Sequence, residues 1–240
     1  MKRSRTSLIS QEKKEQICNR LPRPRQVHWF RQKLNKWFSK NRRSFPWRAS
    51  TDAYVICIAE VFLQQTTASK VAEIIGQFTE KFPSWDAIAG ATTEEIETTI
   101  HPLGLFRRRA QTLHQLANAL VIRGGLPHTR QGLENLPGIG QYIANVLLVV
   151  LQQKREPFLD VNMSRVLERF FGPREMADIR DDPYLQVLAR KVVNVKDALS
   201  ANWMILDFAA IICQKRRPRC PDCPLLQRCQ YARKSIISTY

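Results

Sequence analysis

The stretch "LENLPGIGQYIANVLLVVL" at residues 133–151 decides the fold. Gly138 and Gly140 surround a turn that opens a long apolar helix, and Tyr142 follows two residues after the second glycine. Such a turn is often an anion site, because backbone N–H groups point outward there and the helix dipole favours negative charge. A dinucleotide-binding loop would follow a strand and reach a third glycine. Here a helix-like stretch and a proline precede the glycines, and Ala144 follows them instead of a third glycine. We therefore expect an anion other than the pyrophosphate of a cofactor.

The rest of the chain shows helical periods as well. In residues 108–125 apolar side chains recur on one face, and Gly124 and Gly125 supply a stop. Thr92 and Glu95 have the spacing of a capping box. The apolar run at 145–152 alternates too poorly for a strand. We therefore predict an all-α fold of roughly ten helices joined by short loops.

Positive charge is concentrated at the two ends of the chain. The whole sequence has 38 Lys and Arg against 21 Asp and Glu. Residues 1–50 hold 15 basic and 2 acidic side chains, and residues 213–240 hold 7 and 1. Residues 51–212 hold 16 and 18. If the ends fold together, they form one positive face that suits a polyanion, with nucleic acid ahead of an anionic membrane. An ordinary soluble basic protein is the alternative.

Neither a membrane span nor a secretory signal is expected. No run of 18 apolar residues occurs, and the first sixteen residues lack the apolar core of a signal peptide. The acidic residues Glu12 and Glu15 weaken the interpretation of this stretch as a transit peptide. We expect a monomer without membrane partners that is cytoplasmic and nucleoid-associated in a prokaryote, or nuclear in a eukaryote. The cysteines should then be thiols or metal ligands rather than disulfides.

Four cysteines near the C-terminus have metal-ligand spacing. Cys213, Cys220, Cys223 and Cys229 form C-x6-C-x2-C-x5-C within 17 residues. Zinc sites usually combine two close cysteine pairs that lie far apart in the sequence. One close pair with longer arms fits an iron–sulfur cluster at least as well. Basic residues lie between these cysteines, so the loop could be held against a phosphate backbone.

Several stretches together resemble one known family. They are, in chain order, "FPWR" (45–48), "AEVFLQQTTASKV" (59–71), "GLFRRRAQTLHQLA" (104–117), "LPGIGQYIANVL" (136–147), "FLDVNMSRVLERFFG" (158–172) and the four-cysteine loop. This order resembles the endonuclease III-like helix-hairpin-helix (HhH-GPD) DNA glycosylases over about 185 residues, from Phe45 to Cys229. Within the family the chain looks most like the mismatch branch. Members of that branch remove thymine or uracil opposite guanine, or adenine opposite guanine or its oxidised form.

The resemblance implies two helical domains with a cleft between them. Residues 51–158 would form a six-helix barrel domain that contains the helix-hairpin-helix motif. Residues 1–50 and 159–240 would form a discontinuous second domain that carries the four-cysteine loop. In this family the loop holds a structural [4Fe–4S] cluster, so we favour that cofactor over zinc.

The resemblance assigns catalysis to two carboxylates. Asp160 falls on the invariant carboxylate position, where it would stabilise positive charge on the deoxyribose and orient the attacking water. From the residues alone, helix capping explains Asp160 equally well. Asn162 and Arg165 flank it and would support it or contact a phosphate. Glu60 lies in a nearly uncharged run, so burial would keep it protonated and able to donate to the departing base. An exposed glutamate on an amphipathic helix is the alternative.

Tyr142 predicts the type of reaction. Bifunctional family members carry a lysine at this position that attacks C1′ and then nicks the strand, whereas a phenol forms no Schiff base. The resemblance therefore implies a monofunctional enzyme whose abasic product passes to an AP endonuclease. Tyrosine in place of serine points to the thymine and uracil branch. Gly138 and Gly140 would turn backbone N–H groups toward a DNA phosphate.

Other family positions suggest how a base is flipped from the duplex. Gln64 or Gln65 would fill the space in the stack, and Leu105 would act as an apolar wedge. Loop packing is the alternative for Leu105. Trp47 and Arg48 would contact the base or a phosphate, although a place in the core suits the tryptophan as well.

The sequence thus predicts a monofunctional DNA glycosylase that acts on double-stranded DNA with a mismatched or damaged base, namely thymine or uracil opposite guanine. Adenine excision opposite guanine or 8-oxoguanine is the nearest alternative. Only eleven residues follow Cys229, which we expect to be too few for a domain that reads 8-oxoguanine. A DNA-binding protein of this fold that has lost catalysis is the third hypothesis.

Overall fold

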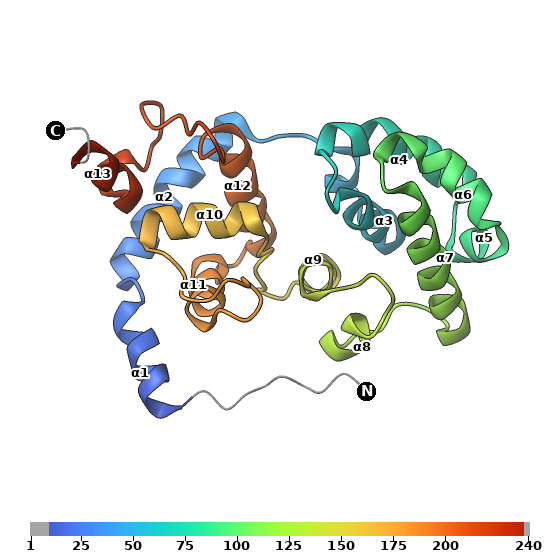
Figure 1. Cartoon of the computed structure of the whole chain (residues 1–240), viewed down its shortest axis with the longest axis horizontal. Coiled ribbons are helices and arrows are strands. Elements are labelled where there is room, and N and C mark those ends of the chain that lie inside the picture. The colour runs from blue at the N-terminus through green and yellow to red at the C-terminus, as the bar shows by residue number, and fades with distance from the viewer. Residues whose placement is uncertain (1–9, 238–240) are drawn as a thin grey trace. The chain divides into compact units, whose positions relative to one another are not determined.

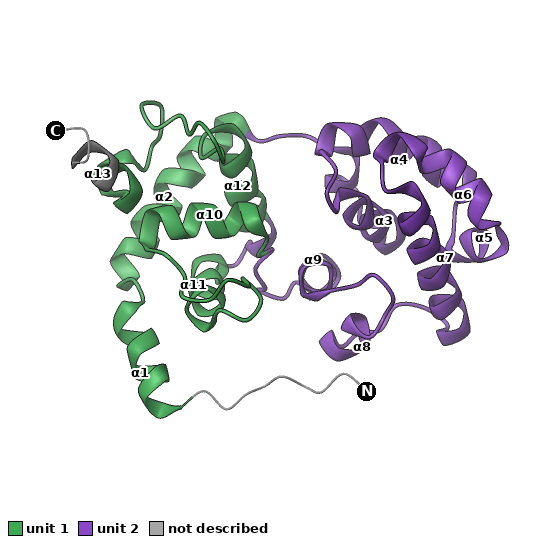
Figure 2. Cartoon of the chain, viewed as in Figure 1, with its two compact units in different colours: residues 1–41, 159–195, 200–240 green, residues 42–158, 196–199 purple. Residues whose placement is uncertain are grey.

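The computed structural model describes residues 10–237 of the 240-residue chain. The N-terminal nine residues, on which much of the signal-peptide argument rests, lie outside this part. All regular structure within the described residues is helical, so the all-α prediction is confirmed. The chain divides into two compact units (Figure 2). We call residues 1–41, 159–195 and 200–240 the cysteine unit, and residues 42–158 and 196–199 the hairpin unit.

The cysteine unit combines both ends of the chain (Figure 1). Its helices are α1 (Gln11–Arg20), α2 (Pro24–Asn41), α10 (Val161–Phe171), α11 (Pro183–Val193), α12 (Ala198–Ile211), the 3₁₀ helix η3 (Leu226–Arg228) and α13 (Gln230–Ile237). The first two residues of α12 are assigned to the hairpin unit. Helix α10 packs against α11 and α13. Phe30 of α2 lies against Phe170 and Phe171, with ring centroids 4.9 and 5.1 Å apart. These aromatic contacts fix α10, which begins directly after Asp160.

The hairpin unit contains the remaining helices. They are η1 (Pro46–Arg48), α3 (Ala53–Leu63), α4 (Ala68–Lys81), α5 (Trp85–Gly90), α6 (Thr93–Ile100), η2 (His101–Leu103), α7 (Phe106–Arg123), α8 (Arg130–Glu134) and α9 (Gln141–Gln152). Helix α3 is buried along nearly its whole length and packs on α4, α7 and α9. A helix that is apolar all round belongs in the middle of a core, and α3 takes that place.

Local signals in the sequence end and begin these helices as expected. Helix α7 stops at Gly124, whose φ of 76° is the left-handed conformation that glycine adopts easily. The capping box at Thr92 and Glu95 is formed in both directions. Residues 145–152 are helical within α9. In the part of the chain that the structure describes, no helix has the length and apolarity needed to cross a bilayer.

Candidate active site and nucleic-acid interface

Asp160 caps the N-terminus of α10. Its Oδ1 accepts hydrogen bonds from the backbone N–H groups of Asn162 and Met163 at 2.9 and 2.7 Å. Its Oδ2 accepts from Nδ2 of Asn162 at 2.6 Å. The capping role and the catalytic role are therefore compatible, because the bonds that cap the helix also hold the carboxylate in one orientation.

Two opposing effects act on the pKa of Asp160. Burial is the larger one and raises the pKa above its ordinary value. The hydrogen bonds from Met163 and Asn162 and the charge of Arg165 favour the ionised form and lower it in part. The carboxylate is thus less solvated than a surface aspartate but retains donors that stabilise its charge.

Arg165 links Asp160 to the start of the four-cysteine loop. Its Nη1 donates to Oδ1 of Asn162 at 3.1 Å, and Asn162 in turn donates to Asp160. Its Nε donates to the carbonyl oxygen of Cys213 at 2.8 Å, and its Nη2 donates to that of Ala209 at 3.1 Å. These bonds make Arg165 a structural support for the orientation of Asn162 and the carboxylate.

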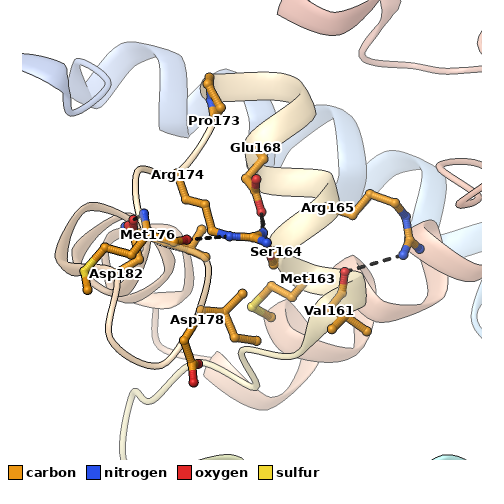
Figure 3. A network of polar contacts seen from close by, with 12 residues as sticks. Val161, Met163, Ser164, Arg165, Glu168, Pro173, Arg174, Met176, Asp178 and Asp182 are labelled. Carbon is orange, nitrogen blue, oxygen red and sulfur yellow. Dashed lines mark hydrogen bonds and ion pairs between the residues drawn. The ribbon is translucent and has the colours of Figure 1, made fainter.

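A second polar network ties α10 to the loop that follows it (Figure 3). Nη1 of Arg174 donates to Oε1 of Glu168 at 2.6 Å and to Oγ of Ser164 at 3.3 Å. The buried Asp182 caps α11 through the N–H of Leu185 and also accepts from the N–H of Met176 at 2.8 Å. The loop between α10 and α11 is thereby tied to both helices, which limits movement of the helix that carries Asp160.

The hairpin between α8 and α9 has the geometry that the glycines predicted. Gly138 has a φ of 75°, and a Cβ atom there would lie 2.4 Å from Cγ2 of Thr112. Gly138 is therefore required both by its backbone conformation and by the lack of space. Gly140 precedes α9 as its N-cap. Helix, hairpin and helix occur in the order that defines the motif.

Tyr142 lies in the first turn of α9 and is half-buried. Its ring is 6.2 Å from that of the buried Phe158, measured between centroids, at an interplanar angle of 64°. The edge-to-face contact holds the phenol against the segment that leads to Asp160 in the sequence. No amine stands at this position.

Glu60 is buried in α3, with 7% of its surface exposed. The exposed alternative is therefore wrong, because α3 is covered on nearly all sides rather than amphipathic. Cys57 lies one helical turn earlier and is fully buried. Burial raises the pKa of the Cys57 thiol to about 12. A carboxyl and a neutral thiol thus share an apolar helix.

The proposed plug and wedge residues lie on two exposed turns. Gln65 and Leu105 both have left-handed backbone conformations, with φ of 60° and 50°. Such angles are uncommon for residues other than glycine and often mark functional sites. Leu105 exposes 56% of its surface, and Gln64 donates through Nε2 to the Gly138 carbonyl at 3.3 Å.

Arg109 was not predicted, and it joins these two turns. Although it is charged, only 6% of its surface is exposed. Its Nη2 donates to the Gln64 carbonyl at 2.6 Å and to Oγ1 of Thr66 at 3.0 Å. Its Nη1 donates to the Gly104 carbonyl at 2.8 Å and to that of Leu103 at 3.3 Å. Burial lowers the pKa of Arg109.

Trp47 and Arg48 belong to η1. Trp47 is buried and its ring stacks on that of Phe45, with centroids 4.8 Å apart and planes 5° from parallel. Arg48 donates through Nη1 to the Arg43 carbonyl at 3.0 Å, and its guanidinium lies over the Phe45 ring. Trp47 thus belongs to the core, which is the alternative to contact with a base.

All four cysteines of the loop are half-buried. Burial raises the pKa of Cys223 to about 12, and the charges of Cys229, Cys213 and Cys220 add to the rise. Nη1 of Arg169 lies 3.5 Å from Sγ of Cys213. Within residues 10–237, however, no three His, Cys, Asp or Glu side chains are arranged closely enough to hold a metal ion. The four thiols are ligands of the type that thiolate-bound metals use, although the side chains are not arranged as a metal site.

Comparison with known proteins agrees with this fold. Residues 58–181 match the family model described as "HhH-GPD superfamily base excision DNA repair protein". A thymine/uracil-DNA glycosylase of Pyrobaculum aerophilum is 37% identical over 210 residues, which cover 84% of this chain and 91% of that protein. A thymine-DNA glycosylase of Aeropyrum pernix is 35% identical over 212 residues, covering 85% and 95%.

A solved structure is similar over nearly the same length. It is described as a thermostable thymine-DNA glycosylase and superposes with a TM-score of 0.82 at 31% identity, covering 88% of this chain and 98% of that one. The matched family model and these relatives place the chain among base excision DNA repair proteins. The chain belongs to the HhH-GPD superfamily.

Proposed function

We propose that this protein is a monofunctional DNA glycosylase that removes thymine or uracil paired with guanine. The observation that carries the proposal is the half-buried carboxylate of Asp160, held by three hydrogen bonds at the head of α10. Two relatives that are 37% and 35% identical support the choice of base, because they are named thymine/uracil-DNA glycosylase and thymine-DNA glycosylase. The enzyme would act as a monomer on nucleoid or nuclear DNA and leave its product to an AP endonuclease.

Asp160 would act on the sugar. Breaking an N-glycosidic bond leaves positive charge on the deoxyribose ring, and an ionised carboxylate near C1′ stabilises that charge. The same oxygen can orient the attacking water or accept its proton. Because Asn162 and Met163 already donate to the carboxylate, its position requires little rearrangement when substrate binds.

Glu60 and Tyr142 would divide the remaining work in the hairpin unit. A carboxyl as deeply buried as Glu60 favours its protonated form, which can donate a hydrogen bond to the departing base. Tyr142 lacks an amine, so no covalent imine forms with the sugar and the strand stays intact. Asp160 and Glu60 would thus serve as the ionised and the neutral carboxyl of one reaction.

Base flipping would use the two exposed turns and the hairpin. Leu105 would enter the stack as a wedge, and Gln64 or Gln65 would occupy the space that the base leaves. The backbone around Gly138 and Gly140 would contact a phosphate without reading the sequence. Arg48 would contact a phosphate, and the buried Trp47 would hold η1 in the core.

Cys213, Cys220, Cys223 and Cys229 would hold a [4Fe–4S] cluster. Four thiols in one half-buried loop form the donor set that such clusters use. The cluster would fold and stabilise the loop. The hydrogen bond from Arg165 to the Cys213 carbonyl would then anchor that folded loop beside Asn162 and Asp160. Iron content and visible absorbance of the purified protein test this proposal directly, and zinc in place of iron would contradict it.

The activity is tested with four labelled duplexes that contain G·T, G·U, G·A or 8-oxoG·A. After incubation, hot alkali cleaves any strand that has lost its base. Cleavage of the pyrimidine strand in G·T and G·U supports the proposal. Cleavage of the adenine strand would instead identify an adenine glycosylase, and binding without cleavage would identify a non-catalytic protein. Strand breaks before alkali treatment would contradict the monofunctional mechanism.

A further inference from the structure

A basic pocket in the cysteine unit lies apart from Asp160. Arg23, Arg25, Gln26 and Arg228 line a pocket of about 540 Å³. An adjoining pocket of about 320 Å³ shares three of these side chains and adds Arg233 of α13. Arg23 and Arg25 come from the start of α2, whereas Arg228 comes from the four-cysteine loop. Only the fold brings these arginines together, because about 200 residues separate them in the sequence.

The lining of this arginine pocket offers hydrogen-bond donors. Oε1 of Gln26 already accepts from the backbone N–H of Arg23 at 2.9 Å, so its amide N–H₂ group remains for a ligand. The three guanidinium groups are exposed and carry donors only. Among the described residues no ion pair involves Arg23, Arg25 or Arg228. Three cations that converge without a carboxylate favour an anion as the missing partner.

The position of the pocket is fixed by aromatic contacts. The guanidinium of Arg228 lies 4.7 Å from the centroid of the Trp29 ring. That ring stacks on Phe170 at 6.0 Å, with planes 14° from parallel. Phe170 belongs to the last turn of α10, whereas Asp160 caps the first turn. Ten residues of helix span about 15 Å, so the pocket and the catalytic carboxylate lie at opposite ends of one helix.

We propose that this arginine pocket binds a backbone phosphate of the substrate DNA, several nucleotides away from the target base. A planar guanidinium matches the geometry of a phosphate and can bind two of its oxygens. One strand of duplex DNA presents a charge about every 3.4 Å along its axis, so a span of about 15 Å laid along that axis corresponds to four or five phosphates. The inference rests on the proposed function, because it assumes that Asp160 marks the target nucleotide.

The test compares two double variants that remove equal charge. Arg23→Ala/Arg25→Ala removes two cations from the pocket. Lys13→Ala/Lys14→Ala removes two exposed cations from the neighbouring helix α1, outside the pocket lining. Fluorescence anisotropy gives the Kd of each protein for an undamaged duplex over a range of salt concentrations. Loss of one phosphate contact lowers the slope of log K against log salt by about 0.9.

We expect the arginine variant to bind about tenfold more weakly, which equals about 1.4 kcal/mol, with the slope reduced by about one. The lysine variant should retain its slope and most of its affinity. Equal losses in both variants would show only a diffuse effect of net charge and would overturn the proposal. Wild-type binding and slope in the arginine variant would overturn it as well.

Shortened duplexes locate the contact. The duplex is truncated from one end and then from the other, so that the fourth and fifth phosphates from the target are removed on one side at a time. The affinity difference between wild type and the arginine variant should vanish on one truncated duplex and persist on the other. Persistence on both would refute a contact at this distance.

Two further measurements distinguish a DNA phosphate from free phosphate, and an effect on DNA binding from an effect on catalysis. Calorimetric titration with inorganic phosphate alone should give only weak binding, and binding tight enough to compete with DNA would overturn the assignment to a DNA phosphate. At saturating enzyme, the single-turnover excision rate of the arginine variant should equal that of wild type. If neither protein excises a base, the proposed function fails, whereas binding to undamaged DNA still tests the pocket.

Discussion

Replacing Arg109 by methionine tests whether this buried arginine positions the two turns that carry Gln65 and Leu105. Methionine keeps much of the apolar volume but provides no donor. The change leaves the carbonyls of Gln64, Gly104 and Leu103 without the guanidinium to which they now accept.

The expected loss of stability follows from these contacts. A hydrogen bond from a charged donor contributes about 1.5 to 3 kcal/mol, and the contributions of neighbouring bonds are not additive. The bonds of 2.6 and 2.8 Å should dominate, because those of 3.0 and 3.3 Å are longer. We expect Arg109→Met to lower the free energy of unfolding by about 3 kcal/mol, which corresponds to a fall in Tm of about 6–12 °C.

Two further variants make the result specific. Arg108→Met changes an exposed neighbour in the same helix, and its effect should stay within about 0.5 kcal/mol. Arg109→Lys retains the charge but loses the forked geometry, so it should restore stability only in part.

A purely structural residue would affect melting alone, so base unstacking needs its own measurement. The fluorescence of 2-aminopurine placed beside the target base reports that unstacking. At a temperature where all variants are folded, Arg109→Met should show a much smaller fluorescence rise than wild type. Normal melting or normal unstacking in Arg109→Met would refute the positioning role.

Three other perturbations have defined outcomes. Tyr142→Lys should introduce an amine that forms an imine with the sugar, so borohydride should trap a covalent protein–DNA adduct. Failure to trap an adduct would mean that residue 142 does not reach C1′. Gly138→Ala should lower the Tm, because the new Cβ would lie 2.4 Å from Cγ2 of Thr112 and alanine would have to adopt a φ of 75°. Adding Thr112→Ser removes Cγ2 and should recover only the part of the Tm loss that the clash causes. An unchanged Tm in Gly138→Ala would contradict the hairpin geometry. Asp160→Asn should raise the Tm at neutral pH, since burial raises the pKa of the folded carboxyl above its unfolded value. The protonated carboxyl stabilises the folded state below the unfolded pKa, and this contribution is lost as the pH rises through the folded pKa. The Tm difference between Asp160→Asn and wild type should therefore disappear in melting curves recorded below about pH 3.

Much of the helical framework could be predicted because its signals are local. The stop at Gly124, the capping box of Thr92 and the helical period of residues 145–152 each depend on a few neighbouring residues. The glycines of the hairpin are similar, since the required backbone angle restricts the residue type wherever the turn occurs.

Long-range contacts could not be predicted in the same way. Arg109 stands in a run of three arginines, and the available signal was its register, four residues before the buried Leu113 on the same helical face. Whether Trp47 faces a base or the core depends on how η1 packs, which the motif alone does not specify. The meeting of Arg23 with Arg228 depends on how both chain ends fold together.

Excision by wild type and Asp160→Asn on one G·U duplex tests the central claim most directly. Single-turnover rates are measured at saturating enzyme, together with the Kd for the same duplex. The account predicts that wild type releases the uracil, whereas the amide variant loses at least about a thousandfold in rate with a nearly unchanged Kd. An Asp160→Asn protein that excises uracil as fast as wild type would contradict it.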